Sequence, residues 1–117
     1  MPNEPGLLRG DVVVGVFARD HGKPRPAVVV QSDAFNQTHT SLLLCPITSE
    51  ITGMSMARVK LPASTATGLQ QESEVMVEKL GAVERRRIRQ RIGQLTAAQM
   101  ESVDAALRVW LDLPYMK

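Results

Sequence analysis

Residues 11–30 read DVVVGVFARDHGKPRPAVVV, and this stretch decides the fold. Its two ends, residues 12–17 and 27–31, are rich in β-branched side chains over the length of a strand, and a polar segment with glycine and proline separates them. The pattern predicts two strands joined by a short loop. Because a proline cannot lie within a central hydrogen-bonded ladder, Pro24 and Pro26 place Arg25 at the entrance of the second strand.

The β pattern continues beyond this pair. Residues 41–45 form an apolar run that ends before Pro46, and residues 56–61 and 74–80 alternate between apolar and charged side chains. These segments predict three further strands.

The period changes after residue 83. Ile88 and Ile92 are four residues apart within the basic segment 84–92, and Gly93 follows where a helix cap is expected. This spacing predicts a short basic helix.

A second helix is predicted after Thr96. Thr96 and Gln99 have the spacing of a capping box, and Pro114 marks the end of the helix. Apolar residues recur at three- and four-residue steps in this segment: Met100, Val103, Ala106, Leu107, Trp110 and Leu111. We expect this stripe to pack against the sheet.

The sequence therefore predicts one α+β domain, mostly β, over residues 1–117. A loose leader (1–8) precedes a small, strongly curved sheet or barrel (9–82), and two helices follow (83–113). The chain has 117 residues and 44% hydrophobic residues, enough for a core without staples. The lone Cys45, the lack of a signal-peptide pattern and the shortness of the apolar runs predict a cytoplasmic protein with no membrane contact.

Several kinds of chemistry are disfavoured by spacing. His21, His39 and Cys45 match no zinc-ligand pattern, and we expect neither a metal nor another cofactor. No serine triad and no glycine-rich phosphate loop is present. Cys45 lies in an apolar run, where an inert core thiol is expected.

Five arginines crowd a short segment: Arg85, Arg86, Arg87, Arg89 and Arg91. A nucleic-acid surface is one interpretation, although the net charge of +2 permits such contact without requiring it. A solvated helix surface that pairs with local acids is the other. A helix-turn-helix is disfavoured because the second helix carries Glu101 and Asp104, which would repel phosphate.

Arg25 and Thr48 form the most suggestive pair. One is a cation at the entrance of the second predicted strand, and the other is a hydroxyl just beyond Pro46, at the exit of the third. These strand ends are expected to be neighbours.

At this point the sequence resembles a known family in several short motifs. They are RGDVV (9–13), KPRPAVVV (23–30), FN (35–36), PITS (46–49), TGL (67–69) and SEVMVEK (73–79). Their order and spacing are similar to those of the MazF/PemK family of toxin–antitoxin endoribonucleases.

The resemblance implies an SH3-like barrel with appended helices and a homodimer that binds single-stranded RNA, mainly messenger RNA, in a groove across the dimer. It implies a cognate antitoxin whose disordered segment folds onto the groove. The family's catalytic arginine and threonine map onto Arg25 and Thr48. Cleavage in the family needs no metal, is sequence-specific, and proceeds by attack of the ribose 2′-hydroxyl, leaving 2′,3′-cyclic phosphate and 5′-hydroxyl ends.

The chain also departs from the family pattern. Its first loop is short, with Asp20 and His21 as the nearest matches to a family base or RNA contact; an exposed loop histidine is the plainer interpretation of His21. Some members use an arginine and an aspartate on the fifth strand, where this chain has Met76 and Glu78. Further RNA contacts are expected at four positions: Ser49, Ser73, Glu78 and Lys79.

Two other functions stay open on the sequence alone. CcdB-type toxins share the barrel and poison DNA gyrase through the end of the last helix, where this chain has Trp110. The stripe on the second helix also explains Trp110 as a core residue. A third possibility is an inactive barrel that binds RNA or a protein partner.

Overall fold

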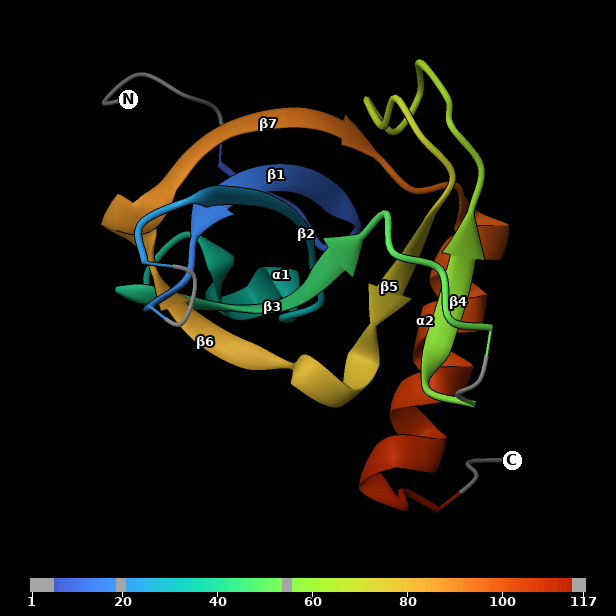
Figure 1. Ribbon diagram of the computed structural model, residues 1–117. Helices are drawn as coiled ribbons and strands as arrows, with labels where there is room; N and C mark the ends of the chain where they lie inside the picture. The colour runs from blue at the N-terminus through green and yellow to red at the C-terminus, as the bar shows by residue number, and fades with distance from the viewer. Residues whose placement is uncertain (1–5, 19–20, 54–55, 115–117) are drawn as a thin grey trace.

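The structure is a computed structural model that describes residues 6–18, 21–53 and 56–114. One strongly curved antiparallel sheet carries a single long helix at its C-terminal end (Figure 1). The strands are β1 (Asp11–Val16), β2 (Pro24–Val29), β3 (Ser41–Thr48), β4 (Arg58–Leu61), β5 (Ser73–Met76), β6 (Gly81–Glu84) and β7 (Ile88–Gln94). The helices are α1 (Asp33–Asn36) and α2 (Ala97–Leu111), with 3₁₀ turns η2 (Val77–Lys79) and η3 (Arg85–Arg87).

The mostly β fold is confirmed, but the sheet is open rather than a closed barrel. Its strands follow the order β4-β5-β3-β2-β1-β7, with β6 attached to β3 beside this path. The sheet does not close because the chain turns away through η3 between β6 and β7, and the two strands never pair with each other in the described part of the chain.

The prediction of the first C-terminal helix is wrong. Residues 85–87 form a 3₁₀ turn, and residues 88–94 form β7, which pairs antiparallel with β1. Ile88 and Ile92 are four residues apart, and this spacing fits a strand, where alternate residues share a face, as well as a helix. Pairing with β1 decides in favour of the strand. The predicted boundary at residue 83 between the sheet and the helices is therefore wrong, since β7 belongs to the sheet.

Gly93 lies where two segments of the chain cross closely, and it does not cap a helix. A Cβ atom at Gly93 would lie 2.4 Å from the carbonyl oxygen of Ala66. Gly68 meets β7 in the same way: its φ is +78°, and a Cβ atom there would lie 2.3 Å from the Ile92 carbonyl oxygen. Only glycine fits where the 62–72 segment crosses β7.

Two apolar clusters lie on opposite faces of the sheet. Val12 and Val13 are both fully buried, one in each cluster, because successive side chains of a strand point to opposite faces. The first cluster includes Val103 and Ala106 of α2, whereas the second fills the inside of the curve. Burial on both faces explains the continuous apolar run of β1.

The capping box of α2 is confirmed, and the predicted burial of Trp110 is wrong. Thr96 accepts a hydrogen bond from the N–H of Gln99, and the Gln99 side chain accepts one from the N–H of Thr96. Trp110 is 52% exposed. α2 packs beside β4 and η2, and its last turn continues past them (Figure 1).

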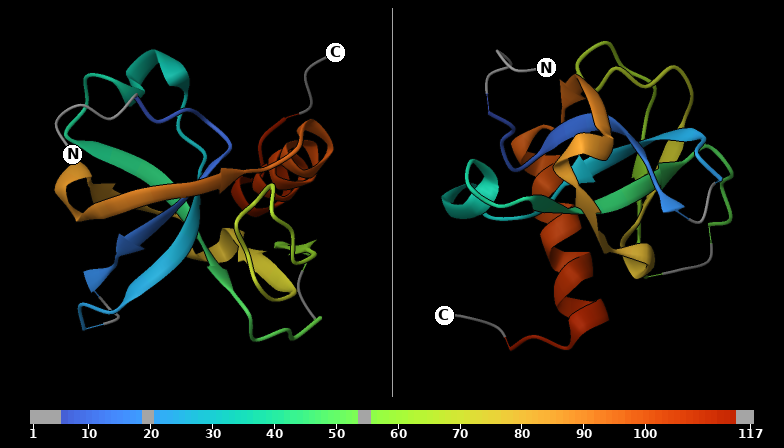
Figure 2. Two further views of the ribbon diagram at one scale, coloured as in Figure 1. Left: turned by 90° about the horizontal axis from the view of Figure 1, so that it is seen from above. Right: turned by 90° about the vertical axis from the view of Figure 1, so that its left-hand side faces the viewer.

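A short helix, α1, interrupts the predicted polar loop on another side of the sheet (Figure 2). Ser32 caps its start by accepting a hydrogen bond from the N–H of Ala34. The Arg85 guanidinium donates to the carbonyl oxygens of Asn36 and His39 at its end. Leu7, in the predicted loose leader, packs against the second apolar cluster, and residues 1–5 of that leader lie outside the described residues. No helix in the described part of the chain is long and apolar enough to span a membrane.

Candidate active site

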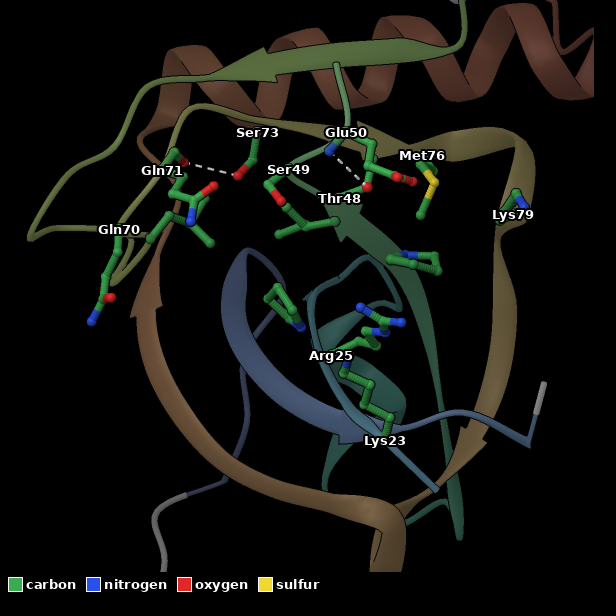
Figure 3. Close-up of a pocket in the computed structure, with 14 residues that line it drawn as sticks. Lys23, Arg25, Thr48, Ser49, Glu50, Gln70, Gln71, Ser73, Met76 and Lys79 are labelled. Carbon is green, nitrogen blue, oxygen red and sulfur yellow. Dashed lines mark hydrogen bonds between the residues drawn. The ribbon is translucent and has the colours of Figure 1, made fainter. Parts of the chain in front are cut away.

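A cleft of about 630 Å³ lies where β2 begins and β3 ends. Its walls come from the start of β2, the end of β3 and the segment that leads into β5, with Met76 and Lys79 at one side (Figure 3). Arg25, Thr48, Ser49, Ser73 and Lys79 all line it. The structure thus brings together the predicted catalytic pair and three of the four predicted RNA contacts.

Arg25 is exposed within the first part of β2. Here β2 pairs with β1, and its pairing with β3 starts only at Ala27, so Pro24 and Pro26 interrupt no central ladder. The residue opposite Arg25 on β1 is Gly15, which has no side chain to crowd the guanidinium. Figure 3 shows the guanidinium directed from β2 toward the end of β3.

Thr48 is the last residue of β3 and is half-buried. Its hydroxyl oxygen accepts a hydrogen bond of 3.1 Å from the N–H of Glu50, which fixes the turn after the strand. The hydroxyl hydrogen can then donate to a ligand in the cleft. The same turn brings the side chains of Ser49 and Glu50 to the cleft wall.

The charge of the cleft suits an anionic ligand. Among the described residues that line it, the cations Lys23, Arg25 and Lys79 face a single carboxylate, Glu50. A cluster of cations in a concave surface attracts polyanions such as RNA.

Four lining residues were missed by the sequence analysis: Lys23, Glu50, Gln70 and Gln71. Three of them adjoin quoted motifs: Glu50 follows PITS, and the two glutamines follow TGL. That adjacency was the available signal. Ser73 is almost fully buried, and its hydroxyl donates to the Gln71 carbonyl oxygen at 2.9 Å, so it holds the cleft wall in place.

Of the two loop candidates for a base, the structure describes His21 only, and it does not line the cleft. His21 is exposed in the loop between β1 and β2, with a φ of 54°, and it is not among the residues that line the cleft. This position fits the plainer interpretation of His21. Asp20, the other candidate, lies outside the described residues.

Glu78 belongs to an ion-pair network rather than to the cleft. Arg58 donates to Glu78 (Nη2 to Oε2, 2.6 Å) and to Glu74 (Nη1 to Oε1, 3.0 Å). The Glu74 side chain is only 1% exposed and also accepts hydrogen bonds from the N–H groups of Thr52 and Gly53. Glu78 therefore has an internal partner and is not among the described residues that line the cleft, and its RNA contact stays a prediction.

The network changes the acidity of both carboxyl groups. Burial alone would raise the pKa of Glu74, but the N–H groups of Thr52 and Gly53 and the Arg58 guanidinium hold it below its ordinary value. Burial opposes the same change at Glu78, where hydrogen bonds from Arg58 lower the pKa. Both groups thus stay ionised at neutral pH. Glu74 anchors the loop between β3 and β4 through Thr52 and Gly53, and Glu78 holds Arg58 at the start of β4.

The arginine cluster divides into several local roles. Arg85 caps α1, Arg86 and Arg87 pair with Glu84, and Arg91 pairs with Asp11. The expected pairing with local acids is present, on a strand and a 3₁₀ turn instead of a helix.

Cys45 is confirmed as a core residue. It is fully buried in the apolar cluster beneath α2, and burial raises the pKa of its thiol to about 12. A thiol in this state is not a nucleophile at neutral pH. No group of three potential metal-ligating side chains occurs within the described ranges.

Comparisons of this sequence with known proteins point to one family. The sequence profile of a family described as PemK-like, MazF-like toxin of type II toxin–antitoxin system matches residues 8–111. The chain is 33% identical over 108 residues to a probable endoribonuclease MazF of Mycolicibacterium smegmatis, with 92% of this chain and 98% of that protein covered. It is 37% identical over 94 residues to endoribonuclease MazF9 of Mycobacterium tuberculosis, covering 76% and 79%.

Solved structures show the same fold. An endoribonuclease in complex with its cognate antitoxin, from a mycobacterial species, superposes with a TM-score of 0.80 at 19% identity, covering 94% of this chain and 99% of that one. The curved sheet with one C-terminal helix is therefore shared with that protein.

Proposed function

Because the chain belongs to the family of PemK-like, MazF-like toxins of type II toxin–antitoxin systems, we propose that it cuts single-stranded RNA, with messenger RNA as its main substrate. The observation that carries this proposal is the cleft that Arg25 and Thr48 both line, where the described cations outnumber the one carboxylate. Relatives that match most of the chain are named as endoribonucleases.

We assign to Arg25 the stabilisation of the negative charge that develops in the transition state. The oxygen of the ribose 2′-hydroxyl attacks the adjacent phosphorus, and negative charge gathers on the non-bridging oxygens of the intermediate. The bond between the phosphorus and the 5′-oxygen of the next nucleotide then breaks. A guanidinium offers a planar fork of donors that meets two of these oxygens at once. Thr48 donates to a phosphate oxygen and orients the reacting groups.

An arginine side chain is a poor base, so the proton of the 2′-hydroxyl needs another acceptor. Glu50 carries the one carboxylate among the described residues that line the cleft, and its N–H already contacts Thr48. We assign the proton acceptor to Glu50. The 5′-oxygen leaves the phosphorus and takes up a proton from water, so the products are a 2′,3′-cyclic phosphate and a 5′-hydroxyl end.

The test is cleavage of mixed-sequence RNA by the purified protein in excess EDTA. We expect cuts at a restricted set of sequences with cyclic phosphate and 5′-hydroxyl ends, because the proposed donors and acceptor are all side chains. Mapping of both ends by sequencing, with and without phosphatase treatment, identifies the chemistry. Intact RNA, or 3′-hydroxyl ends, would contradict the proposal.

The other functions have less support. A gyrase poison of the CcdB type needs an accessible end of the last helix, and Trp110 is exposed there. However, the match over residues 8–111 is to PemK-like and MazF-like toxins. An inactive barrel would not need Arg25 and Thr48 in one cationic cleft.

The partners follow from the same family. We propose that a cognate antitoxin covers the cleft, since a structural relative was solved in complex with its cognate antitoxin. A disordered acidic segment suits this cleft because it can fold onto the cationic wall as it binds. The cytoplasm, where messenger RNA is translated, is the proposed location.

We propose that two copies of the chain associate through the face formed by α2 and β4. Exposed apolar side chains occur just before β4, in the last turn of α2 and just beyond it: Met56, Val109, Trp110, Leu111 and Leu113. Met56 and Val109 also line a shallow groove between β4 and α2, with Ala105 and Ala106 at its floor. Apolar surface of this extent, rimmed by polar residues, is typical of an interface.

Replacing Trp110 with glutamate should shift the protein from dimer to monomer. A charge at the centre of an apolar interface must lose its water without gaining a partner. Sedimentation at micromolar concentration measures the change, and Phe35→Glu is the matched control because Phe35 is also 52% exposed but lies on α1. A wild-type monomer, or equal effects of both variants, would refute this interface.

A further inference from the structure

A second groove shares the residue Lys79 with the cleft. It lies between β6 and the residues at the end of β1, 16–18, and its volume is about 440 Å³. Arg87 lines this groove near the other end of β6. The name β6 groove is used below for this surface. A ligand that extends from the cleft past Lys79 would therefore reach the β6 groove.

The backbone of β6 offers hydrogen-bonding groups to the groove. β6 pairs antiparallel with β3, its one strand partner in the described part of the chain. The Arg85 N–H donates to the Thr40 carbonyl oxygen at 2.7 Å, and bonding alternates along an antiparallel pair. The N–H groups that face β3 are thus those of Gly81, Val83 and Arg85, whereas those of Ala82 and Glu84 point to the opposite edge.

The charges of the groove favour a phosphate chain. Lys79 is exposed and the Arg87 side chain is 37% exposed. The one carboxylate among the described lining residues, Glu84, already pairs with Arg86 at 3.0 Å and with Arg87 at 3.4 Å. Ion pairs this exposed are weak, so a phosphate can compete for Arg87 while Arg86 continues to neutralise Glu84.

We propose that single-stranded RNA bound in the cleft continues past Lys79 into the β6 groove, where a phosphate contacts Arg87. This inference rests on the proposed function and extends its binding site by a second segment. The N–H groups of Ala82 and Glu84 supply further donors, because backbone N–H groups commonly bind phosphate and sugar oxygens. Ala82 and the adjacent Gly81 have little or no side chain, so the sugar–phosphate backbone can approach closely.

The prediction is a length-dependent role for Arg87. The probes are fluorescent RNA oligonucleotides with a 2′-deoxyribose at the mapped cut position, one just covering the cut site and others extended by about four nucleotides at either end. For an extended probe, Arg87→Ala should raise the Kd about fivefold and reduce the slope of log K against log salt concentration by about 0.7, the value for one phosphate contact on a single strand. The short probe should bind both proteins equally.

Arg89→Ala is the matched control. It removes the same charge from an exposed residue of β7 that does not line the groove, and it leaves Glu84 with both of its arginine partners. It should leave the Kd of every probe within about twofold of wild type. Both residues are at the surface, and circular dichroism will verify that the variants are folded.

Three results would overturn the inference. Equal losses in the two variants would indicate a general charge effect, and an equal loss on short and long probes would place Arg87 within the primary site. No loss at all would mean that RNA does not enter the groove, as expected if it binds an extended protein segment instead. In each case normal cleavage by the wild type would leave the proposed function standing, whereas a wild type that neither binds nor cuts RNA would refute both.

Discussion

Replacing Arg25 with alanine is expected to lower the rate of RNA cleavage by at least about 100-fold and to leave the fold intact. Removing one donor to the developing charge of a transition state typically costs 10²–10³ in kcat, and a guanidinium supplies two. Arg25 is exposed, and its side chain is in neither apolar cluster, so stability should change little. Single-turnover rates on a mapped RNA site, together with thermal unfolding, measure both effects.

Two further variants show whether the loss is specific to Arg25. Lys23→Ala removes another cation that lines the same cleft. It should lower the cleavage rate by less than about tenfold, because the Lys23 charge is expected to help bind the RNA in its ground state and in the transition state equally. Glu50→Gln should slow the reaction and alter its dependence on pH, as expected for a lost proton acceptor. If Arg25→Ala and Lys23→Ala had similar small effects, the assignment of Arg25 would be wrong.

Replacing Arg58 with methionine should lower the free energy of unfolding by about 3–5 kcal/mol at pH 7. Arg58 is the cation between Glu74 and Glu78, and Glu74 is almost completely buried. Methionine keeps an apolar stem but leaves the Glu74 carboxylate ionised, without its positive partner, in a site that water does not reach. Chemical denaturation at a fixed protein concentration measures the loss.

The pH dependence of the free energy of unfolding distinguishes the loss of the positive partner of Glu74 from a simple loss of packing. Both carboxyl pKa values are lowered in the folded protein, so the network stabilises it above the ordinary glutamate pKa, and this stability is lost as the pH falls through the lowered values. Without Arg58, the pKa of Glu74 should lie above its wild-type value, so protonation at a higher pH should remove the unpaired charge and part of the loss in stability. The difference between variant and wild type should narrow as the pH falls from 7 to about 4.

The control for this experiment is Arg89→Met, the same chemical change at an exposed position of β7. It should alter the free energy of unfolding by less than about 0.5 kcal/mol. A loss below about 1 kcal/mol in Arg58→Met, or a deficit that does not change with pH, would show that the network contributes little to stability.

Local pattern was enough to predict much of the sheet and the start of the last helix. The β-branched runs of β1 and β2 and the apolar run of β3 have few alternatives, and a capping box depends only on Thr96 and Gln99. The position of Arg25 followed from the prolines on either side, since each removes a backbone donor and excludes a central ladder at that point. Thr48 followed from the end of an apolar run.

Other features depend on contacts between residues far apart in sequence. Ile88 and Ile92 fit either a helix or a strand, and only the partner β1 selects the strand. Glu78 looked available for RNA because nothing near it in sequence indicated Arg58, twenty residues earlier. Trp110 continues a helical stripe, yet the stripe is buried only as far as β4 and η2 extend beneath it.

The sequence by itself determined the mostly β fold and the second of the two predicted helices, and it identified Arg25 and Thr48 as the pair to examine. Such features depend on backbone preference and on short motifs, which act within a few residues. Only the tertiary structure decided that the sheet stays open, that Glu78 is held by Arg58, and that the cleft and the β6 groove share Lys79. These outcomes depend on which distant segments pack together, and a side chain becomes available for function only when no such neighbour takes it.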